Sequence, residues 1–162
     1  MTKVEMNKDM KLSEHFTLGE LTKTSYKTED QNIPNRVAIE NLKNLCENWL
    51  EDLRYSYNTL YPGDCPQEEI PLVINSGYRS PEVNKRAGGS ATSNHLTGCA
   101  VDIHVSGFEQ AIRYASILLD ISDGTKRDFD ELDIERNKTG SHWIHFAVRP
   151  KGNRRKIDFI KV

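Results

Sequence analysis

The sequence predicts an α+β fold in which a small, mostly antiparallel sheet has its helices packed on one side. Three observations support this prediction. Residues 99–105 alternate between apolar and polar side chains, as a half-buried strand does. Residues 42–53 carry apolar side chains at helical spacing. Residues 130–135 and 142–148 are predicted as strands joined by a short turn, so the strands come as hairpins rather than as βαβ units.

The amino-terminal half is predicted to contain two helices and one strand. Thr17 and Glu20 have the spacing of a capping box, which opens a short helix. In the helix over residues 42–53, charged and amide side chains fill the face opposite the apolar one, so this helix is expected to pack behind the sheet. Residues 71–76 follow a turn-rich segment and are predicted to form a short strand.

The carboxy-terminal half continues with short elements around the strands. Pro81 is predicted at the first position of a helix that ends near Arg86, because proline is favoured there. The small, polar residues 89–98 are predicted as a loop, and residues 111–119 as a helix. Residues 151–161 are basic, and we expect a turn-like, solvated edge.

Length and composition limit the possible classes of protein. A chain of 162 residues with 36% hydrophobic content fits one domain over residues 1–162. Because 22 basic residues nearly balance 24 acidic ones, no nucleic-acid partner is expected. No segment approaches the ~20 apolar residues of a membrane span. Cys46, Cys65 and Cys99 have irregular spacings, which argues against a disulfide framework and against a thiolate metal site.

Residues 1–14 are expected to be flexible or loosely packed. The amino-terminal segment is polar and lacks the apolar run of ~7–15 residues that a secretory signal needs. As written, the chain is therefore expected to remain in the cytoplasm, to reach the cell wall by a release that needs no signal, or to have lost a leader. We expect a monomer.

Two segments place possible metal ligands close together. His95 lies in the predicted loop, and Asp102 follows seven residues later in the predicted strand. Gly98 lets the backbone turn between them, so the imidazole can fold back above the strand face. His145 can come from a neighbouring strand. Two histidines, one aspartate and one position left for water make the ligand count of a catalytic zinc site, although each residue taken singly also has a purely structural explanation.

Three blocks of the sequence resemble, in the same order, the signature blocks of the zinc D-alanyl-D-alanine peptidases. They are SGYRSP at residues 76–81, SNHLTGCAVD at residues 93–102 and WIH at residues 143–145. That family includes wall carboxypeptidases, dipeptidases of glycopeptide resistance, and phage endolysins that cut between L-alanine and D-glutamate. Residues 16–21 and 40–45 also resemble a subgroup of short, single-domain members that is common in phage and prophage sequences.

The resemblance implies a fold like that of D-Ala-D-Ala peptidases and hedgehog domains, with zinc bound by His95, Asp102 and His145. It also implies that Arg79 holds a carbonyl or carboxylate oxygen of the substrate, for which the guanidinium offers a fixed fork of donors. The structural alternative for Arg79 is a surface arginine that caps a turn. Ser93 is expected to hydrogen-bond a ligand or the substrate.

The general base is the point at which this sequence departs from better-known members. Many of them carry a glutamate three positions before the last zinc histidine, or a histidine two positions before it. Here these positions hold His142 and Trp143. His142 titrates near neutrality, but a spacing of three in a regular strand puts it on the opposite face from His145. Glu135, in the preceding strand, could reach the site across the hairpin, and we favour it slightly.

Two functions follow from these interpretations. The leading hypothesis is zinc-dependent hydrolysis of a peptide bond in peptidoglycan stem peptides, either as a D-Ala-D-Ala carboxypeptidase or as an endopeptidase of the L-Ala-D-Glu type. The alternative is a non-catalytic module that keeps the fold and the metal and binds cell-wall peptides or another partner. The absence of a base at the usual position is the observation that favours the alternative.

Overall fold

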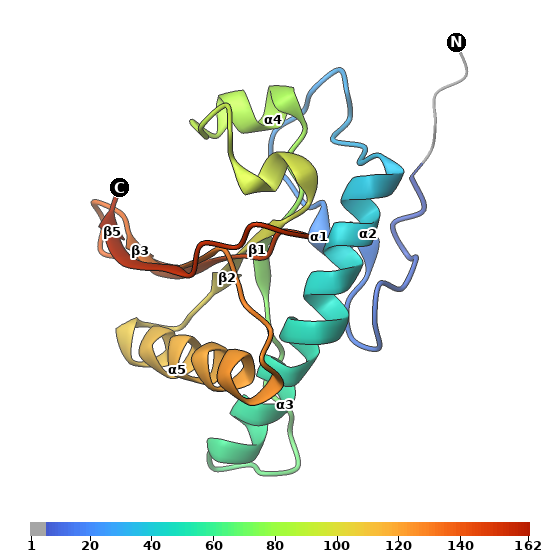
Figure 1. Ribbon diagram of the computed structural model, residues 1–162. Coiled ribbons are helices and arrows are strands. Elements are labelled where there is room, and N and C mark those ends of the chain that lie inside the picture. Colours follow the sequence, from blue (N-terminus) through green and yellow to red (C-terminus); the bar gives the residue numbers. More distant parts are fainter. Residues whose placement is uncertain (1–5) are drawn as a thin grey trace.

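Five strands form one sheet in the computed structural model, which describes residues 6–162. The order across the sheet is β1-β2-β4-β3-β5 (Figure 1). All neighbouring pairs are antiparallel except β3 and β5, which run parallel. The predicted α+β class and the mostly antiparallel sheet are therefore confirmed. The strand bounds are β1 (Ile74–Ser76), β2 (Ala100–His104), β3 (Glu131–Arg136), β4 (His142–Ala147) and β5 (Lys156–Lys161).

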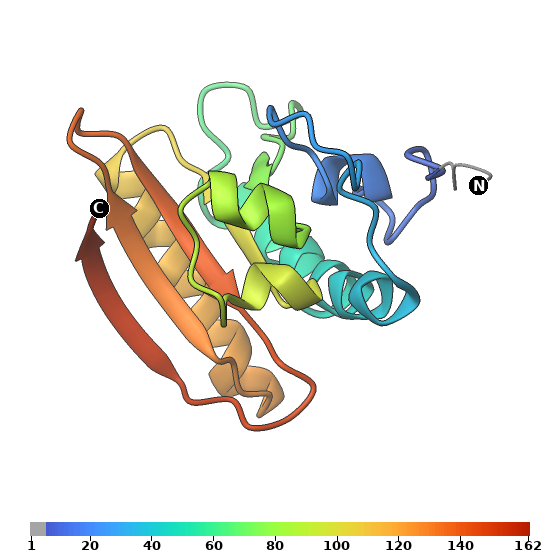
Figure 2. The same ribbon diagram turned by 90° about the horizontal axis from the view of Figure 1, so that it is seen from above.

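The helices divide between the two faces of the sheet. Helix α5 runs along one face, whereas α4 and the 3-10 helix η2 lie over the other face (Figure 2). The sequence predicted that all helices pack on one side of the sheet. The two short helices α4 and η2 differ from this prediction, because they lie on the other side. The bounds are α1 (Leu18–Leu21), α2 (Arg36–Leu45), η1 (Cys46–Leu50), α3 (Glu51–Leu60), α4 (Pro81–Arg86), η2 (Asn94–Thr97) and α5 (Phe108–Thr125).

The amphipathic helix predicted over residues 42–53 is part of a longer helical rod. Helix α2, the π-helical turn η1 and α3 follow one another without a break, and the backbone N–H of Glu51 bonds to the carbonyl of Cys46. Trp49 is buried and packs against two aromatic rings of the core, with centroid distances of 5.1 Å to Phe146 and 6.4 Å to Phe129. The rod therefore supports the sheet from behind, as its apolar face predicts.

The register of the strands separates an apolar face from a polar one. Because side chains alternate along a strand, residues aligned across the sheet share a face. Asp102 pairs with His145, and His145 pairs with Asp133, so three polar side chains form a row across β2, β4 and β3. The neighbouring positions carry buried apolar side chains on the α5 side, among them Val101, Ile103, Leu132, Ile144 and Phe146. The sheet thus places its polar side chains opposite the core.

The amino-terminal segment differs from the prediction in its described part. Residues 1–5 lie outside the described residues. Leu12, however, is 2% exposed and belongs to the hydrophobic core, and its backbone N–H donates to the carbonyl of Phe16 at 2.9 Å. A bridge between Lys11 and Thr17 folds the segment back on itself. The expectation of loose packing is corrected from Leu12 onward, and the capping box of Thr17 and Glu20 is confirmed.

Three further boundaries differ from the sequence-based prediction. The basic segment predicted as turn-like contains β5, which pairs with β3 along its full length although most of its side chains are exposed. The predicted loop over residues 89–98 contains η2, and α5 is longer at both ends than residues 111–119. Strand β5 is held by backbone pairing. Because this pairing does not depend on apolar side chains, no apolar pattern in the sequence reveals the strand. Within residues 6–162, no helix is both long and apolar enough to cross a membrane.

The buried carboxylate of Asp130, just before β3, contacts side chains from other segments on the polar side of the sheet. Its oxygens accept hydrogen bonds from Nε and Nη2 of Arg154 at 3.0 and 2.8 Å, and from Nδ2 of Asn94 at 2.8 Å. Arg149 Nε lies 3.2 Å from the same carboxylate. Burial by itself raises the pKa of Asp130, but the hydrogen bonds from Arg154 and Asn94 outweigh it and lower the pKa to about 2.

The variant Asp130→Asn is expected to lower the free energy of unfolding by about 2–4 kcal/mol at pH 7. The folded state holds the carboxylate ionised down to about pH 2, whereas the reference pKa is 3.8. The stabilisation is therefore present above about pH 4 and is lost as the pH falls through 2. Urea unfolding of the wild type and of Asp130→Asn measures the difference between their free energies of unfolding. This difference should be about 1 kcal/mol smaller at pH 3 than at pH 7. The exposed Asp120 provides a control, since Asp120→Asn should change stability little at either pH.

Candidate metal centre

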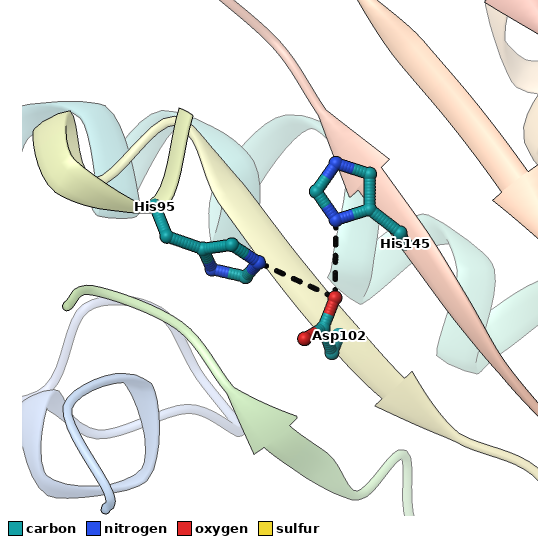
Figure 3. Close-up of side chains that lie close together, drawn as sticks. All are labelled: His95, Asp102 and His145. Atoms are coloured by element: carbon teal, nitrogen blue, oxygen red, sulfur yellow. Dashed lines mark hydrogen bonds and ion pairs between the residues drawn. The ribbon is translucent and has the colours of Figure 1, made fainter. Parts of the chain in front are cut away.

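Three side chains from three parts of the chain meet on the polar face of the sheet (Figure 3). His95 Nε2 lies 3.3 Å from Oδ1 of Asp102, and His145 Nδ1 lies 3.1 Å from the same oxygen. One possible ligand atom from each residue lies within 4.8 Å of the other two. Two imidazole nitrogens and a carboxylate oxygen that converge in this way suit a divalent cation such as zinc.

His95 is held by its 3-10 helix and by a hydrogen bond behind the ring. Ser93 caps η2, and its Oγ accepts from the backbone N–H of His95 at 3.2 Å. Gly98 ends this helix with φ +71°, and a Cβ there would lie 2.4 Å from the carbonyl oxygen of Ala38. His95 Nδ1 lies 2.7 Å from the carbonyl oxygen of Gly77. Since a carbonyl only accepts, Nδ1 carries the proton and Nε2 is left to face Asp102.

The two oxygens of Asp102 have different partners. Oδ1 faces the two histidines, whereas Oδ2 accepts a hydrogen bond from Arg79 Nη2 at 3.0 Å. Arg79 Nε in turn donates to Ser76 Oγ at 3.0 Å. Arg79 therefore lies beside the cluster and is mostly buried, which does not match the alternative of a surface arginine that caps a turn.

The cluster opens into a cavity of about 510 Å³ on the polar face. Its wall consists mainly of charged and polar side chains from η2, β2, β3 and β4. Three arginines, Arg79, Arg149 and Arg154, contribute positive charge to the wall. The other lining residues include Ser93, His95, Asp102, Glu131, Asp133, Glu135, Trp143 and His145.

Comparison with known proteins identifies the family. The model of the peptidase M15 family matches residues 14–129, more than two thirds of the chain. The chain belongs to the peptidase M15 family. Its members are metallopeptidases, so the cluster is a possible metal site in a protein of a metal-dependent family. A search of curated proteins found no significant match.

The family match covers only part of the cavity. It includes Arg79, His95 and Asp102, and it ends before β3 and β4. Glu135 and His145 are therefore assigned to the same cavity by the structure rather than by the match. The resemblance to zinc D-Ala-D-Ala peptidases is confirmed at the level of the M15 family.

The charges in the cluster suit metal binding. Burial by itself raises the pKa of Asp102, but the charges and hydrogen bonds of His95 and His145 outweigh it and hold this pKa well below its ordinary value. Burial lowers the pKa of His145, whereas hydrogen bonds to Asp102 and Glu131 raise it to about 10. The ionised carboxylate attracts whichever cation occupies the centre, either a proton on His145 or a metal ion.

Strand β3 adds two acidic residues to the cavity, Glu131 and Asp133, that the sequence interpretation missed. Glu131, Asp133 and Glu135 alternate with Leu132 and Ile134, so all three carboxylates point to the cavity. Asp133 is 2% exposed, and burial raises its pKa to about 6. Among the described residues, no hydrogen-bond partner approaches its Oδ1. The alternation of acids and aliphatic residues was the signal that could have identified Glu131 and Asp133.

The two candidate bases lie on opposite faces of the sheet. Glu135 lines the cavity, and its Oε2 accepts a hydrogen bond from Trp143 Nε1 at 2.5 Å. Burial and the charge of Asp102 raise the pKa of Glu135. His142 pairs with Arg136 on the α5 side, and its ring lies 5.2 Å from that of Phe108. The structure thus brings Glu135 to the cavity, and it does not bring His142 there.

Proposed function

We propose that this protein is a zinc-dependent peptidase that hydrolyses a peptide bond in the stem peptides of peptidoglycan. The observation that carries the proposal is the convergence of His95, Asp102 and His145 in a cavity that also contains Arg79 and Glu135. Membership of the M15 family supports peptide hydrolysis, and two imidazoles with one carboxylate are a ligand set that zinc accepts.

His95 Nε2, His145 Nδ1 and Oδ1 of Asp102 would hold the metal ion. Zinc bound there would polarise the scissile carbonyl and make a water molecule easier to deprotonate. Three protein ligands would leave a position for water or substrate on the ion, as in catalytic zinc sites. The cavity beside the cluster has the size to accept a peptide segment.

Glu135 acts as the general base in this proposal. It takes a proton from the attacking water and passes it to the leaving amine. A raised pKa suits both steps, because the group must gain and lose a proton near neutral pH. The hydrogen bond from Trp143 holds the carboxylate in one orientation toward the cavity. His142 has no part in these steps because its ring lies on the α5 side of the sheet.

Arg79 orients the substrate. Its guanidinium is anchored through Asp102 and Ser76, so the group is held next to the cluster in a fixed position. Further N–H groups of the same fork would donate to a carbonyl or carboxylate oxygen of the substrate. Ser93 also lines the cavity and would offer a hydroxyl to the peptide.

The arginines of the cavity wall would bind a free carboxylate of the peptide, next to the four acidic side chains that the wall also carries. Arg79, Arg149 and Arg154 lie in the wall, although Arg154 and Arg149 are already paired with Asp130. Stem peptides carry such carboxylates along the chain and at the end. Both proposed cleavages, between two terminal D-alanines and between L-alanine and D-glutamate, therefore remain within the proposal.

Incubation with purified peptidoglycan, followed by mass analysis of the soluble fragments, tests this function. Release of D-alanine would identify a carboxypeptidase, and release of longer stem fragments would identify an endopeptidase. A chelator should abolish either product, and added zinc should restore it. Binding to peptidoglycan without any new fragment, with zinc retained, would instead support the non-catalytic module that His142 at the usual base position favours.

A further inference from the structure

The imidazole of His145 is held at both nitrogens. Nδ1 lies 3.1 Å from Oδ1 of Asp102, on the side of the cluster. Nε2 lies 3.2 Å from Oε1 of Glu131, on the opposite side of the ring. Because ionised carboxylates only accept, both ring nitrogens carry a hydrogen while no metal ion is bound. A metal ion held together with Asp102 would replace the hydrogen on Nδ1, whereas Nε2 would keep the hydrogen that it donates to Glu131.

Glu131 is itself held in place by fixed donors. Asn94 Nδ2 donates to Oε1 of Glu131 at 2.6 Å and to Oδ2 of Asp130 at 2.8 Å. The amide of Asn94 cannot turn around freely, because its Oδ1 accepts from Arg149 Nε at 3.0 Å. The side chain of Glu131 is 18% exposed. These contacts hold the carboxylate in one orientation toward His145.

The two histidines of the cluster are therefore oriented in the same way, by a hydrogen bond from the ring nitrogen that faces away from Asp102. His95 donates from Nδ1 to the carbonyl of Gly77, and His145 donates from Nε2 to Glu131. In both rings the far nitrogen is occupied, so the near nitrogen points at Asp102. Helix η2 contributes to both arrangements, since it carries His95 and also Asn94, which holds Glu131.

We propose that Glu131 is a positioning residue that accepts the Nε2–H of His145 and thereby selects Nδ1 as its metal-binding nitrogen. The inference rests on the proposed function in one respect, namely that His145 is a metal ligand. Carboxylates that accept from the far nitrogen of a ligating histidine orient the ring and make it a stronger ligand.

A second metal ion is the competing explanation, because Glu131, Asp133 and His145 also bring possible ligand atoms within 4.8 Å of one another. The contact from Asn94 argues against it. One amide hydrogen of Asn94 points at the same oxygen of Glu131 that faces His145. The two lone-pair directions of this oxygen are taken by the hydrogens of Asn94 and His145, which leaves none for a cation.

The experiment uses the purified full chain, stripped of metal, with zinc as the titrant and a chromophoric chelator as the competitor. Glu131→Ala is expected to weaken zinc binding about 10–100-fold while one ion still binds per chain. Glu131→Gln should keep most of the affinity, because its amide oxygen can still accept from His145. Asp133→Asn is the matched control, since it removes a charge from the same strand without removing a hydrogen bond to the ring.

Nitrogen NMR of the zinc-loaded chain gives a readout that does not depend on turnover. The wild type should show His145 protonated at Nε2 and bound through Nδ1, and Glu131→Ala should change this pattern. Unchanged zinc affinity and an unchanged pattern in Glu131→Ala would overturn the proposal. Two ions per wild-type chain, with one lost in both Glu131→Ala and Asp133→Asn, would also overturn it. Zinc binding that survives His145→Ala unchanged would instead refute the metal centre of the proposed function.

Discussion

Substitution of Glu135 by glutamine is expected to lower the turnover of stem-peptide hydrolysis by about 10²–10⁴-fold, the range of a lost general base. Glutamine has the same size and can still accept from Trp143, but it cannot take a proton from water. Zinc content and substrate affinity should therefore stay near those of the wild type. Turnover measured by mass analysis of released fragments, together with zinc content per chain, checks both statements.

Two other variants make the test specific. His142→Ala should change turnover little, because the ring of His142 packs near Phe108 on the α5 side. Asp133→Asn tests a second acid with a raised pKa, which pairs with His145 across the sheet. The assignment of Glu135 fails if its glutamine variant stays active while one of the other two loses turnover. Wild-type turnover in all three variants, with zinc bound, would argue against a carboxylate or imidazole base altogether.

Alanine at any one of His95, Asp102 or His145 is expected to lower the zinc content well below one ion per chain and to abolish hydrolysis. The three ligand atoms come from η2, β2 and β4, so removal of one leaves only two protein ligands for the ion. Metal analysis after dialysis against a weak chelator measures the loss, and circular dichroism checks that each variant is folded.

A histidine outside the cluster provides the control for these variants. His104 is exposed and lies two residues after Asp102 on the same strand, but it lines a different cavity. His104→Ala should therefore keep its zinc and its activity. Full metal retention in all three ligand variants would rule out the proposed centre. Zinc loss in His104→Ala alone would indicate that the metal binds further along β2.

Local sequence patterns predicted several parts of this fold correctly. The capping box at Thr17 and the helical spacing around Trp49 involve neighbours within one or two turns, and both appear as predicted. The alternation of residues 99–105 likewise predicted that Asp102 points away from the core. These features depend on residues that are close in sequence, so the chain contains their signal directly.

Strand β5 shows what local patterns miss. Its side chains are mostly exposed, and its place is decided by backbone pairing with β3. Exposed strands lack the buried apolar face on which a sequence prediction depends, so the segment was interpreted as a solvated edge. The same pairing brings Ile160 to the wall of the cavity.

The sequence by itself determined the α+β class, the alternating faces of its strands and, through three ordered blocks, the resemblance to a peptidase family. It favoured Glu135 only slightly over His142 as the base, and only the tertiary structure put Glu135 on the face of His145. Only the tertiary structure revealed that Glu131 and Asp133 flank His145. The physical reason is register, because a shift of one residue between β3 and β4 would turn every side chain of β3 to the other face, and pairing across the sheet is fixed by long-range contacts.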